Sequence, residues 1–243
     1  ENVLLGELGS LHLLSVAYRQ REKLEPNQRA DVEQLVGWPL EKEEVLKGKG
    51  VHDHWFVAAR AFSERNRLVT CSTWLYGQES KRWALVLQFS VPPSQPAVPW
   101  PLGSVVETEL VYLPGTSPDR ALPRLESATA AFPPALPEAP DTVTSLLQRS
   151  ADCLAKNPWQ TRQPFFLAAQ PVARDSETYL VDSDGLALPW KAARGDFELL
   201  TSLCAGRPIP VAGIWDGRYL KVLSADDGSS FFSLKSSAHH SSA

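Results

Sequence analysis

The amino-acid sequence predicts an α+β protein with mostly antiparallel β-sheets, an N-terminal helical hairpin and two further helices. The main observation lies in residues 51–90, where apolar and polar side chains alternate with period two in three successive runs. A second observation is the pair Asp216-Gly217 between two apolar runs, which is a strong hairpin signal. Because strands and helices do not alternate regularly along the chain, a parallel, doubly wound sheet is not expected.

Apolar side chains recur at spacings of three and four from Leu4 onward, which predicts an amphipathic helix that runs to about Leu24. Pro26 cannot continue that helix and suits the first position of a second one, for which Gly37 is the expected C-terminal cap. Residues 41–49 mix glutamate and lysine and predict a short solvated helix. We expect the first two helices to form a hairpin that leads into the sheet.

The three runs within 51–90 predict adjacent strands with apolar side chains on both faces, so both sides of this sheet should be covered. Polar reversals at residues 63–66 and 77–81 separate the runs. Trp55 and Trp74 are core candidates. The third run carries a stripe of large apolar side chains that the helical hairpin should bury: Trp83, Leu85, Leu87 and Phe89.

Residues 91–103 hold five prolines and predict a surface loop. A strand over 105–113 and a short edge strand over 121–125 should follow it. The composition shift in an Ala- and Pro-rich stretch predicts two units, which limited proteolysis should separate by cutting the stretch first. The units are a helical hairpin with an antiparallel β unit in residues 1–127, the linker 128–140, a second α+β unit in residues 141–235 and a tag-like tail in residues 236–243.

The second unit is expected to mix helices and strands. Pro140 and Asp141 mark the start of a helix that Asn157-Pro158 should end. Asp196 and Gly206 should cap a last helix at its two ends. Apolar or alternating runs predict strands over residues 165–172, 177–181, 186–190, 210–215, 218–224 and 231–234.

Composition and charge argue against several classes of protein. With 43% hydrophobic and 21% charged residues, the chain has the balance of an ordinary globular protein. No apolar run approaches the roughly 20 residues that a membrane span needs. A net charge of −4 supplies no overall basic field for nucleic acid. The acidic, amphipathic start predicts no secretory signal, and the three scattered cysteines predict buried free thiols in a reducing cytoplasm.

The sequence shows no catalytic motif and no cofactor motif, and we expect neither catalytic residues nor a cofactor. It lacks a Gly-x-Ser-x-Gly elbow, a Walker-type phosphate loop and a dinucleotide-binding glycine motif. His52 and His54 share one face of a strand while Asp53 points away, and a tetrahedral zinc site needs four closely placed ligands. We therefore expect no metal site. Turn chemistry accounts for acidic residues such as Asp182 and Asp226.

Two tryptophans and two arginines are the candidate binding residues. Trp100 lies in the proline-rich loop and Trp215 at a hairpin tip, so exposed indoles are expected there, unless each ring covers its own hairpin. Exposed aromatic side chains near arginine suit a protein-binding patch. Arg120 and Arg124 lie near the Pro-Gly turn, where they could contact a partner or form ion pairs with Asp119 or Glu126.

Six segments carry a long, ordered set of aromatic and turn residues. They are GELGSLHLLSVAYRQREKLEPNQRADVEQLVGWPLEKEEVL, HDHWFVAARAFSERNRLVTCSTWLYG, RWALVLQF, YLPGTSPDRAL, KNPW and GIWDGRYLKVLS, from about Gly6 to Leu234. Together they resemble the C-terminal region of bacterial SWIM zinc-finger family proteins. The Cys-x-Cys and Cys-x-His pairs that hold zinc in this family are absent from the chain, so no zinc ligand carries over. The resemblance implies a module that follows the finger in a longer protein.

We therefore expect a non-catalytic interaction module, a cytoplasmic scaffold or adaptor attached to a SWIM zinc-finger protein, with an unidentified protein partner. One alternative is an accessory domain for nucleic-acid binding, in which the absent finger would supply the main contact. The other alternative is a hydrolase of unrecognised type. A salt-dependent nucleic-acid shift would favour the first alternative, and bound metal with turnover would favour the second.

Overall fold

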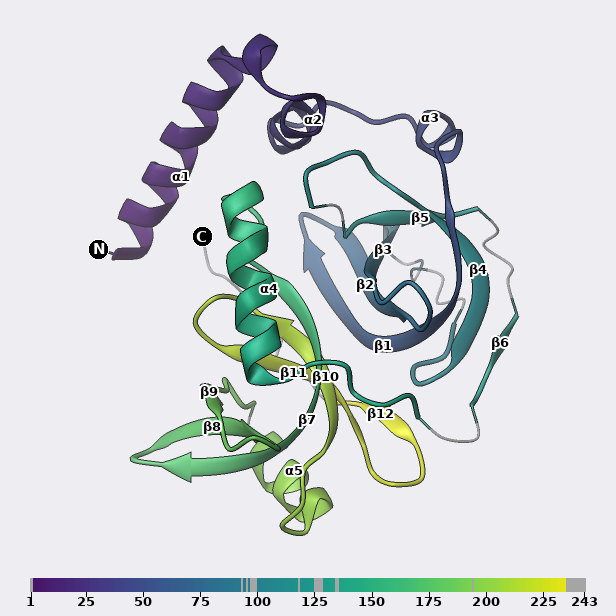
Figure 1. The fold of residues 1–243 in the computed structure, drawn as a ribbon, viewed down its shortest axis with the longest axis vertical. Helices are drawn as coiled ribbons and strands as arrows, with labels where there is room; N and C mark the ends of the chain where they lie inside the picture. Colours follow the sequence, from purple (N-terminus) through teal and green to yellow (C-terminus); the bar gives the residue numbers. More distant parts are fainter. Residues whose placement is uncertain are drawn as a thin grey trace.

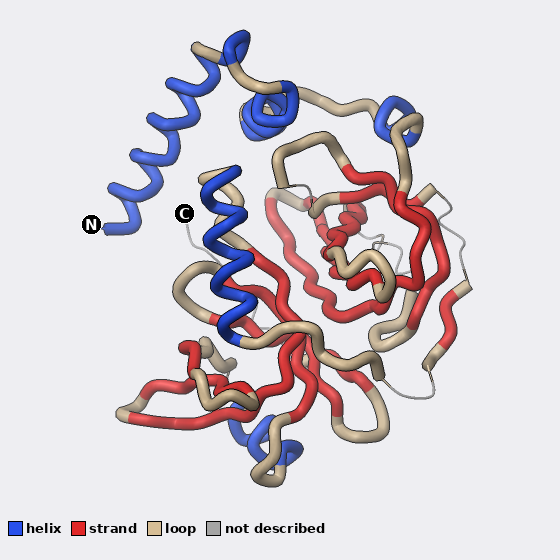
Figure 2. Tube along the Cα trace, viewed as in Figure 1, coloured by secondary structure: helices blue, strands red, loops and turns tan. Residues whose placement is uncertain are grey.

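The computed structural model of the chain describes residues 2–92, 94, 96, 100–117, 119–124, 129–133, 136–193 and 195–234 (Figure 1). It has the predicted α+β architecture, with two antiparallel sheets, N-terminal helices in contact with one another and further helices in the second half. The strands gather into two groups that lie side by side, and the N-terminal helices lie at the periphery (Figure 2).

The first two N-terminal helices do not cover the first sheet, whereas the third packs against two of its strands through Val45. The helix α1 contacts α2, as the predicted hairpin requires, but most of its leucines are exposed, and Leu5 is 71% exposed. The predicted burial of the first sheet beneath this hairpin is therefore wrong. Gly37 has a φ of 93° directly after the C-cap of α2, which confirms its predicted role. The elements are α1 (Asn2–Arg19), the 3-10 turn η1 (Arg21–Lys23), α2 (Pro26–Leu35) and α3 (Lys42–Leu46).

The first sheet curls into a small barrel (Figure 1). Its strands follow the order β3-β2-β1-β4-β5, and β6 pairs with β4. Leu85 forms an isolated bridge with Arg120, and the Leu85 N–H donates a hydrogen bond of 2.6 Å to the Asp119 carbonyl, which joins the two ends of the sheet. The strands are β1 (Val51–Arg65), β2 (Leu68–Gly77), β3 (Trp83–Ser90), β4 (Val105–Tyr112), β5 (Ala121–Pro123) and β6 (Ala130–Ala131).

The first hairpin of the barrel turns later than predicted. The strand β1 continues to Arg65, and the turn consists of Asn66 and Arg67, which have φ angles of 52° and 63°. Two successive positive φ angles are typical of a tight type I′ hairpin turn. The sequence placed the reversal at 63–66 because exposed strand ends and turns carry the same polar side chains.

The interior of the barrel is apolar and contains Trp100. This indole is only 1% exposed, so its predicted exposure is wrong, although Trp100 does lie in a loop. Prolines exclude a regular strand or helix, but they do not determine whether a side chain in the same loop is buried. Arg60 donates to the backbone carbonyl of Trp100 and fixes the chain there. The buried interior residues are Trp55, Val57, Leu75, Ala84, Val86, Trp100, Val106, Leu110 and Ala121.

The large apolar stripe of β3 faces out of the barrel. Ala84 and Val86, the alternate residues, are buried inside, whereas Phe89 is 51% exposed. Trp83 is buried because it belongs to the core between the barrel and the second sheet. Two indoles already fill much of the interior, so β3 contributes small side chains there. The predicted burial of the whole stripe is therefore wrong, because only its first residue is buried.

The second sheet is open and has the order β12-β11-β10-β7-β8-β9. The helices α4 (Val143–Lys156) and α5 (Asp196–Cys204) contact β7 and enclose a core with it. Asp196 is the first residue of α5 and not its cap, since Gly195 occupies the N-cap position. The strands are β7 (Gln163–Arg174), β8 (Glu177–Asp182), β9 (Ala187–Pro189), β10 (Ile209–Trp215), β11 (Leu220–Asp226) and β12 (Phe231–Ser233).

A shared core joins the barrel to the second sheet. The rings of Phe56, Phe166 and Phe231 pack together, with centroids 5.3, 5.4 and 5.8 Å apart. The Ser224 hydroxyl donates a hydrogen bond of 2.5 Å to the Ala58 carbonyl across the same junction. Aromatic contacts of this kind add to the free energy gained by burying apolar area.

The predicted linker lies along this junction. Ala130 and Ala131 form β6, and Leu136 and Ala139 pack against the shared core. Residues 128, 134 and 135 of the linker lie outside the described residues, as does the tail from 235 onward. Proteolysis depends on local opening as well as on folded contacts, so preferred cleavage within 128–140 stays a prediction.

Candidate binding groove beside the barrel

A groove with a cavity volume of about 440 Å³ lies between the barrel and the connection from α2 to α3. One wall is the segment around Trp38, and the other is formed by β3 and β5. Trp100 forms part of the floor. The lining residues are Gln34, Trp38, Pro39, Leu40, Lys42, Val45, Val86, Leu87, Gln88, Phe89, Trp100, Leu113, Arg120, Leu122 and Pro123.

The backbone of β3 is open on the groove side. Leu85 directs its N–H away from β2 toward Asp119. Because N–H and C=O groups alternate in direction along a strand, those of Leu87 and Phe89 point to the same side. Within the described residues, no hydrogen bond pairs the amides of Leu87 and Phe89 on that side. The end of β3 therefore offers unpaired backbone groups beside the groove.

Three large apolar side chains at the groove remain partly exposed. Trp38 is 47% exposed, and Leu40 and Phe89 are exposed to a similar extent. Single exposed apolar residues are common, but these three line one hollow. Aromatic anchors in a concave site supply much of the free energy of typical protein interfaces.

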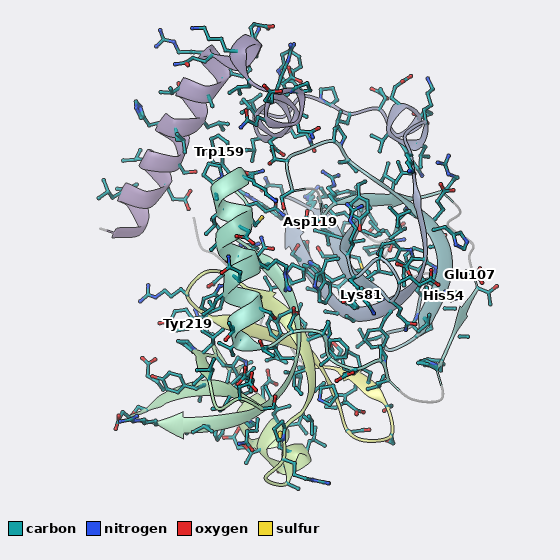
Figure 3. The ribbon with its side chains drawn as sticks, in the orientation of Figure 1. His54, Lys81, Glu107, Asp119, Trp159 and Tyr219 are labelled. Atoms are coloured by element: carbon teal, nitrogen blue, oxygen red, sulfur yellow. The ribbon has the colours of Figure 1, made fainter. Side chains whose placement is uncertain are left out.

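Arg120, one of the predicted binding residues, lines the groove and is exposed. Asp119 is its nearest acidic neighbour in sequence. Burial raises the pKa of Asp119, while hydrogen bonds from backbone groups and from the Gln160 side chain, together with the charge of Arg120, act in the opposite direction. Figure 3 places Asp119 between the barrel and the top of α4. The groove thus has a cationic group at one end.

Arg124 lies outside the groove lining and makes contacts that hold the fold together. Its guanidinium lies 2.7 Å from the Glu109 carboxylate and donates hydrogen bonds of 2.8 and 3.1 Å to the carbonyls of Leu46 and Gly48. These contacts tie the end of β5 to α3. Glu126, an acidic neighbour of Arg124 in the sequence, lies outside the described residues.

Trp215 does not lie at an exposed hairpin tip. It is buried in the core of the second sheet, so its predicted exposure is wrong. As the last residue of β10, it pairs with Leu220 on one side and Gln163 on the other, which places it inside the sheet. The turn itself follows the sequence prediction, since Asp216 accepts hydrogen bonds from the backbone of the next residues.

The structure therefore brings together Trp100 and Arg120, and it places Arg124 and Trp215 elsewhere. Sequence reasoning missed Trp38, Leu40 and Phe89. The available signal was an apolar segment directly after the helix-ending Gly37, but only the folded chain places that segment against β3. The three cysteines are free and buried, as predicted.

A second hollow of about 440 Å³ lies between α4 and β9. Its described lining is apolar or uncharged, and β9 is an edge strand of three residues that pairs with β8 alone among the described strands. This hollow therefore provides no charged group and only a short strand edge. The groove beside the barrel offers a longer strand end together with charged side chains.

Comparison of the chain with protein-family models, curated proteins and solved structures found no significant match. Within the part of the chain that the structure describes, no helix is both long and apolar enough to cross a membrane.

Proposed function

We propose that this chain is a non-catalytic interaction module that binds an extended segment of a partner protein along the open end of β3. The observation that carries the proposal is the unpaired strand edge at Leu87 and Phe89 beside a groove lined by exposed apolar residues. An added strand would satisfy these backbone groups, and alternate side chains of the partner would enter the groove.

The lining favours a partner segment that is both apolar and acidic. Trp38, Leu40 and Phe89 supply apolar contacts. The charged side chains recorded in the lining, Lys42 and Arg120, are both cationic, although the whole chain has a net charge of −4. Such local charge would favour a carboxylate on the partner and disfavour a basic segment.

The wider role that we propose is a cytoplasmic scaffold or adaptor associated with a SWIM zinc-finger protein. The six ordered segments that resemble the C-terminal region of that family support this context. In a longer protein, the finger would be a separate module, and the groove would recruit a second protein.

The test is a selection from a displayed library of random peptides, followed by affinity measurement on purified chain. The informative variant is Leu87→Pro, because proline removes an amide on the open side of β3 and leaves the pairing with β2 intact. We expect selected peptides to be rich in acidic and apolar residues, and Leu87→Pro and Phe89→Asp to weaken their binding at least tenfold, or by about 1.4 kcal/mol.

Phe132→Asp is the matched control, since Phe132 is an exposed phenylalanine outside the groove lining. Its peptide affinity should equal that of the unchanged chain. Peptides that bind Leu87→Pro and Phe89→Asp as tightly as the unchanged chain would refute the proposal. Salt-dependent binding of oligonucleotides in place of peptides would instead favour the nucleic-acid alternative.

A further inference from the structure

A separate group of side chains gathers where β1 passes the turn between β2 and β3. Asp53 and His54 come from β1, and Glu79 comes from the turn. One possible ligand atom from each of these residues lies within 4.8 Å of the others. His54 and Glu107 lie beside one another on this side of the barrel (Figure 3).

Asp53 is the fixed member of the group. It is buried, and its carboxylate accepts backbone hydrogen bonds of 2.6, 3.0 and 2.8 Å from His54, Glu79 and Ser80. A carboxylate offers about four lone-pair sites, and the Ser80 hydroxyl also faces this one, so a bound ion would replace that hydroxyl as the fourth partner. The same bonds position the turn, which brings Glu79 toward His54.

The two ring nitrogens of His54 face different carboxylates. Nδ1 lies 3.2 Å from a Glu79 oxygen, and Nε2 lies 3.9 Å from a Glu107 oxygen. A histidine that binds a metal through one nitrogen usually directs the other nitrogen to a carboxylate, which sets its tautomer and orientation. Glu107 lies on β4 opposite His54 in the strand register and also lies 3.7 Å from His52 Nε2, so a small rotation of its side chain would bring it within hydrogen-bond distance of His54.

We propose that Asp53, His54 and Glu79 form a site for one divalent transition-metal ion of the Zn²⁺ type, with Glu107 orienting His54. In a tetrahedral site with bonds of about 2.0–2.2 Å, ligand atoms lie roughly 3.3 Å apart. His54 and Glu79 are exposed and can make the small side-chain rotation that this requires. Imidazole with carboxylates suits such an ion, whereas Ca²⁺ and Mg²⁺ prefer oxygen ligands alone.

This site differs from the one that the sequence excluded. The sequence offers only His52 and His54 as a local pair of ligands, and strand periodicity puts Asp53 on the opposite face from His54. In the folded chain, Asp53 and His54 nevertheless share a neighbour, because the turn after β2 wraps around the strand edge and places Glu79 in contact with both residues. An ion there would bind the turn to β1 and leave the remaining coordination position to water.

Calorimetric titration with Zn²⁺ and absorption spectroscopy with Co²⁺ test the site on the full chain. Every sample carries His239→Ala and His240→Ala, because these tail histidines would bind metal themselves. We expect one Zn²⁺ per chain and Co²⁺ absorption bands of a low-coordinate site. His54→Ala and Glu79→Gln should each weaken binding at least tenfold, and Glu107→Gln should weaken it about tenfold.

His12→Ala is the matched control, since His12 is an exposed histidine on α1, and its affinity for Zn²⁺ should be unchanged. The variants change exposed side chains, and circular dichroism without metal checks that they fold. Absence of saturable Zn²⁺ binding, or binding unchanged by His54→Ala, would overturn the proposal. A loss at His52→Ala equal to that at His54→Ala would also overturn it, because the ion would then lie between the two histidines and Glu107.

Discussion

The first sheet closes on itself around its own side chains, whereas the second is covered by α4 and α5 on one face and by the barrel on the other. The edges of the two sheets also differ. The second sheet ends in the strands β9 and β12 of three residues each, while β3 in the barrel has eight residues. Short edge strands are a common protection against unwanted pairing. A longer strand end left open beside an apolar groove is therefore the better candidate for recognition.

In both regions, nevertheless, a buried aspartate holds the end of a strand by accepting backbone hydrogen bonds. Asp53 in the barrel and Asp182 in the second sheet are buried, and each accepts three backbone hydrogen bonds. Asp53 holds a turn at the surface. Asp182 holds a turn and also accepts from the Val143 N–H at the start of α4. The buried aspartate of the barrel therefore fixes a turn, whereas the one in the second sheet fixes a turn and the start of a helix.

The largest expected effect concerns the interior of the barrel. Trp100→Ala should lower the free energy of unfolding by about 3–5 kcal/mol, because a fully buried indole leaves a large cavity. Trp83→Ala should cost less, since Trp83 lies on the outer face and remains slightly exposed. Urea denaturation of both variants measures this. A loss below about 1 kcal/mol at Trp100, typical of surface changes, would contradict its burial.

The next effect concerns the two buried aspartates. Asp53→Ala and Asp182→Ala should each cost about 2–3 kcal/mol near neutral pH, because backbone N–H groups lose a charged acceptor. Chemical denaturation measures both losses. A negligible loss of unfolding free energy at either position would show that water replaces the carboxylate there. The two aspartates would then not contribute equally to stability.

For Asp53 the cost should also depend on pH. Burial alone would raise its pKa, but hydrogen bonds from the Ser80 side chain and from the backbone of Ser80, Glu79 and His54 lower it below the ordinary value of 3.8. A lowered pKa stabilises the fold above the ordinary value, and this contribution is lost as the pH falls through the pKa of the folded state. The unfolding free energies of the unchanged chain and of Asp53→Ala should therefore converge in acid.

The smallest expected effect concerns α1. Leu5→Ala and Leu11→Ala should change the free energy of unfolding by less than about 0.5 kcal/mol, since both side chains are largely exposed. The periodic leucines in the sequence would instead suggest a buried face and a loss of about 2–5 kcal/mol. Thermal or urea melts distinguish the two. A loss of the larger size would mean that α1 packs against another part of the chain.

Local rules in the sequence determined much of the fold. Alternation located the strands of residues 51–90, Gly37 ended a helix, Asp216-Gly217 formed the expected hairpin, and Asn157 ended α4. These features depend on backbone preferences and on neighbours a few residues away. They can therefore be read without knowing where the rest of the chain lies.

Only the tertiary structure decided which face of a strand is inside. Period two shows that Trp83 and Phe89 share a face, but closure of the barrel through Leu85 and Arg120 puts Ala84 and Val86 inside instead. The same closure buries Trp100, opens the end of β3 and brings Trp38 beside Phe89. Contacts between residues distant in sequence have no local signature, because each depends on the position of the whole chain. The groove and the Asp53–His54–Glu79 group are both contacts of this kind.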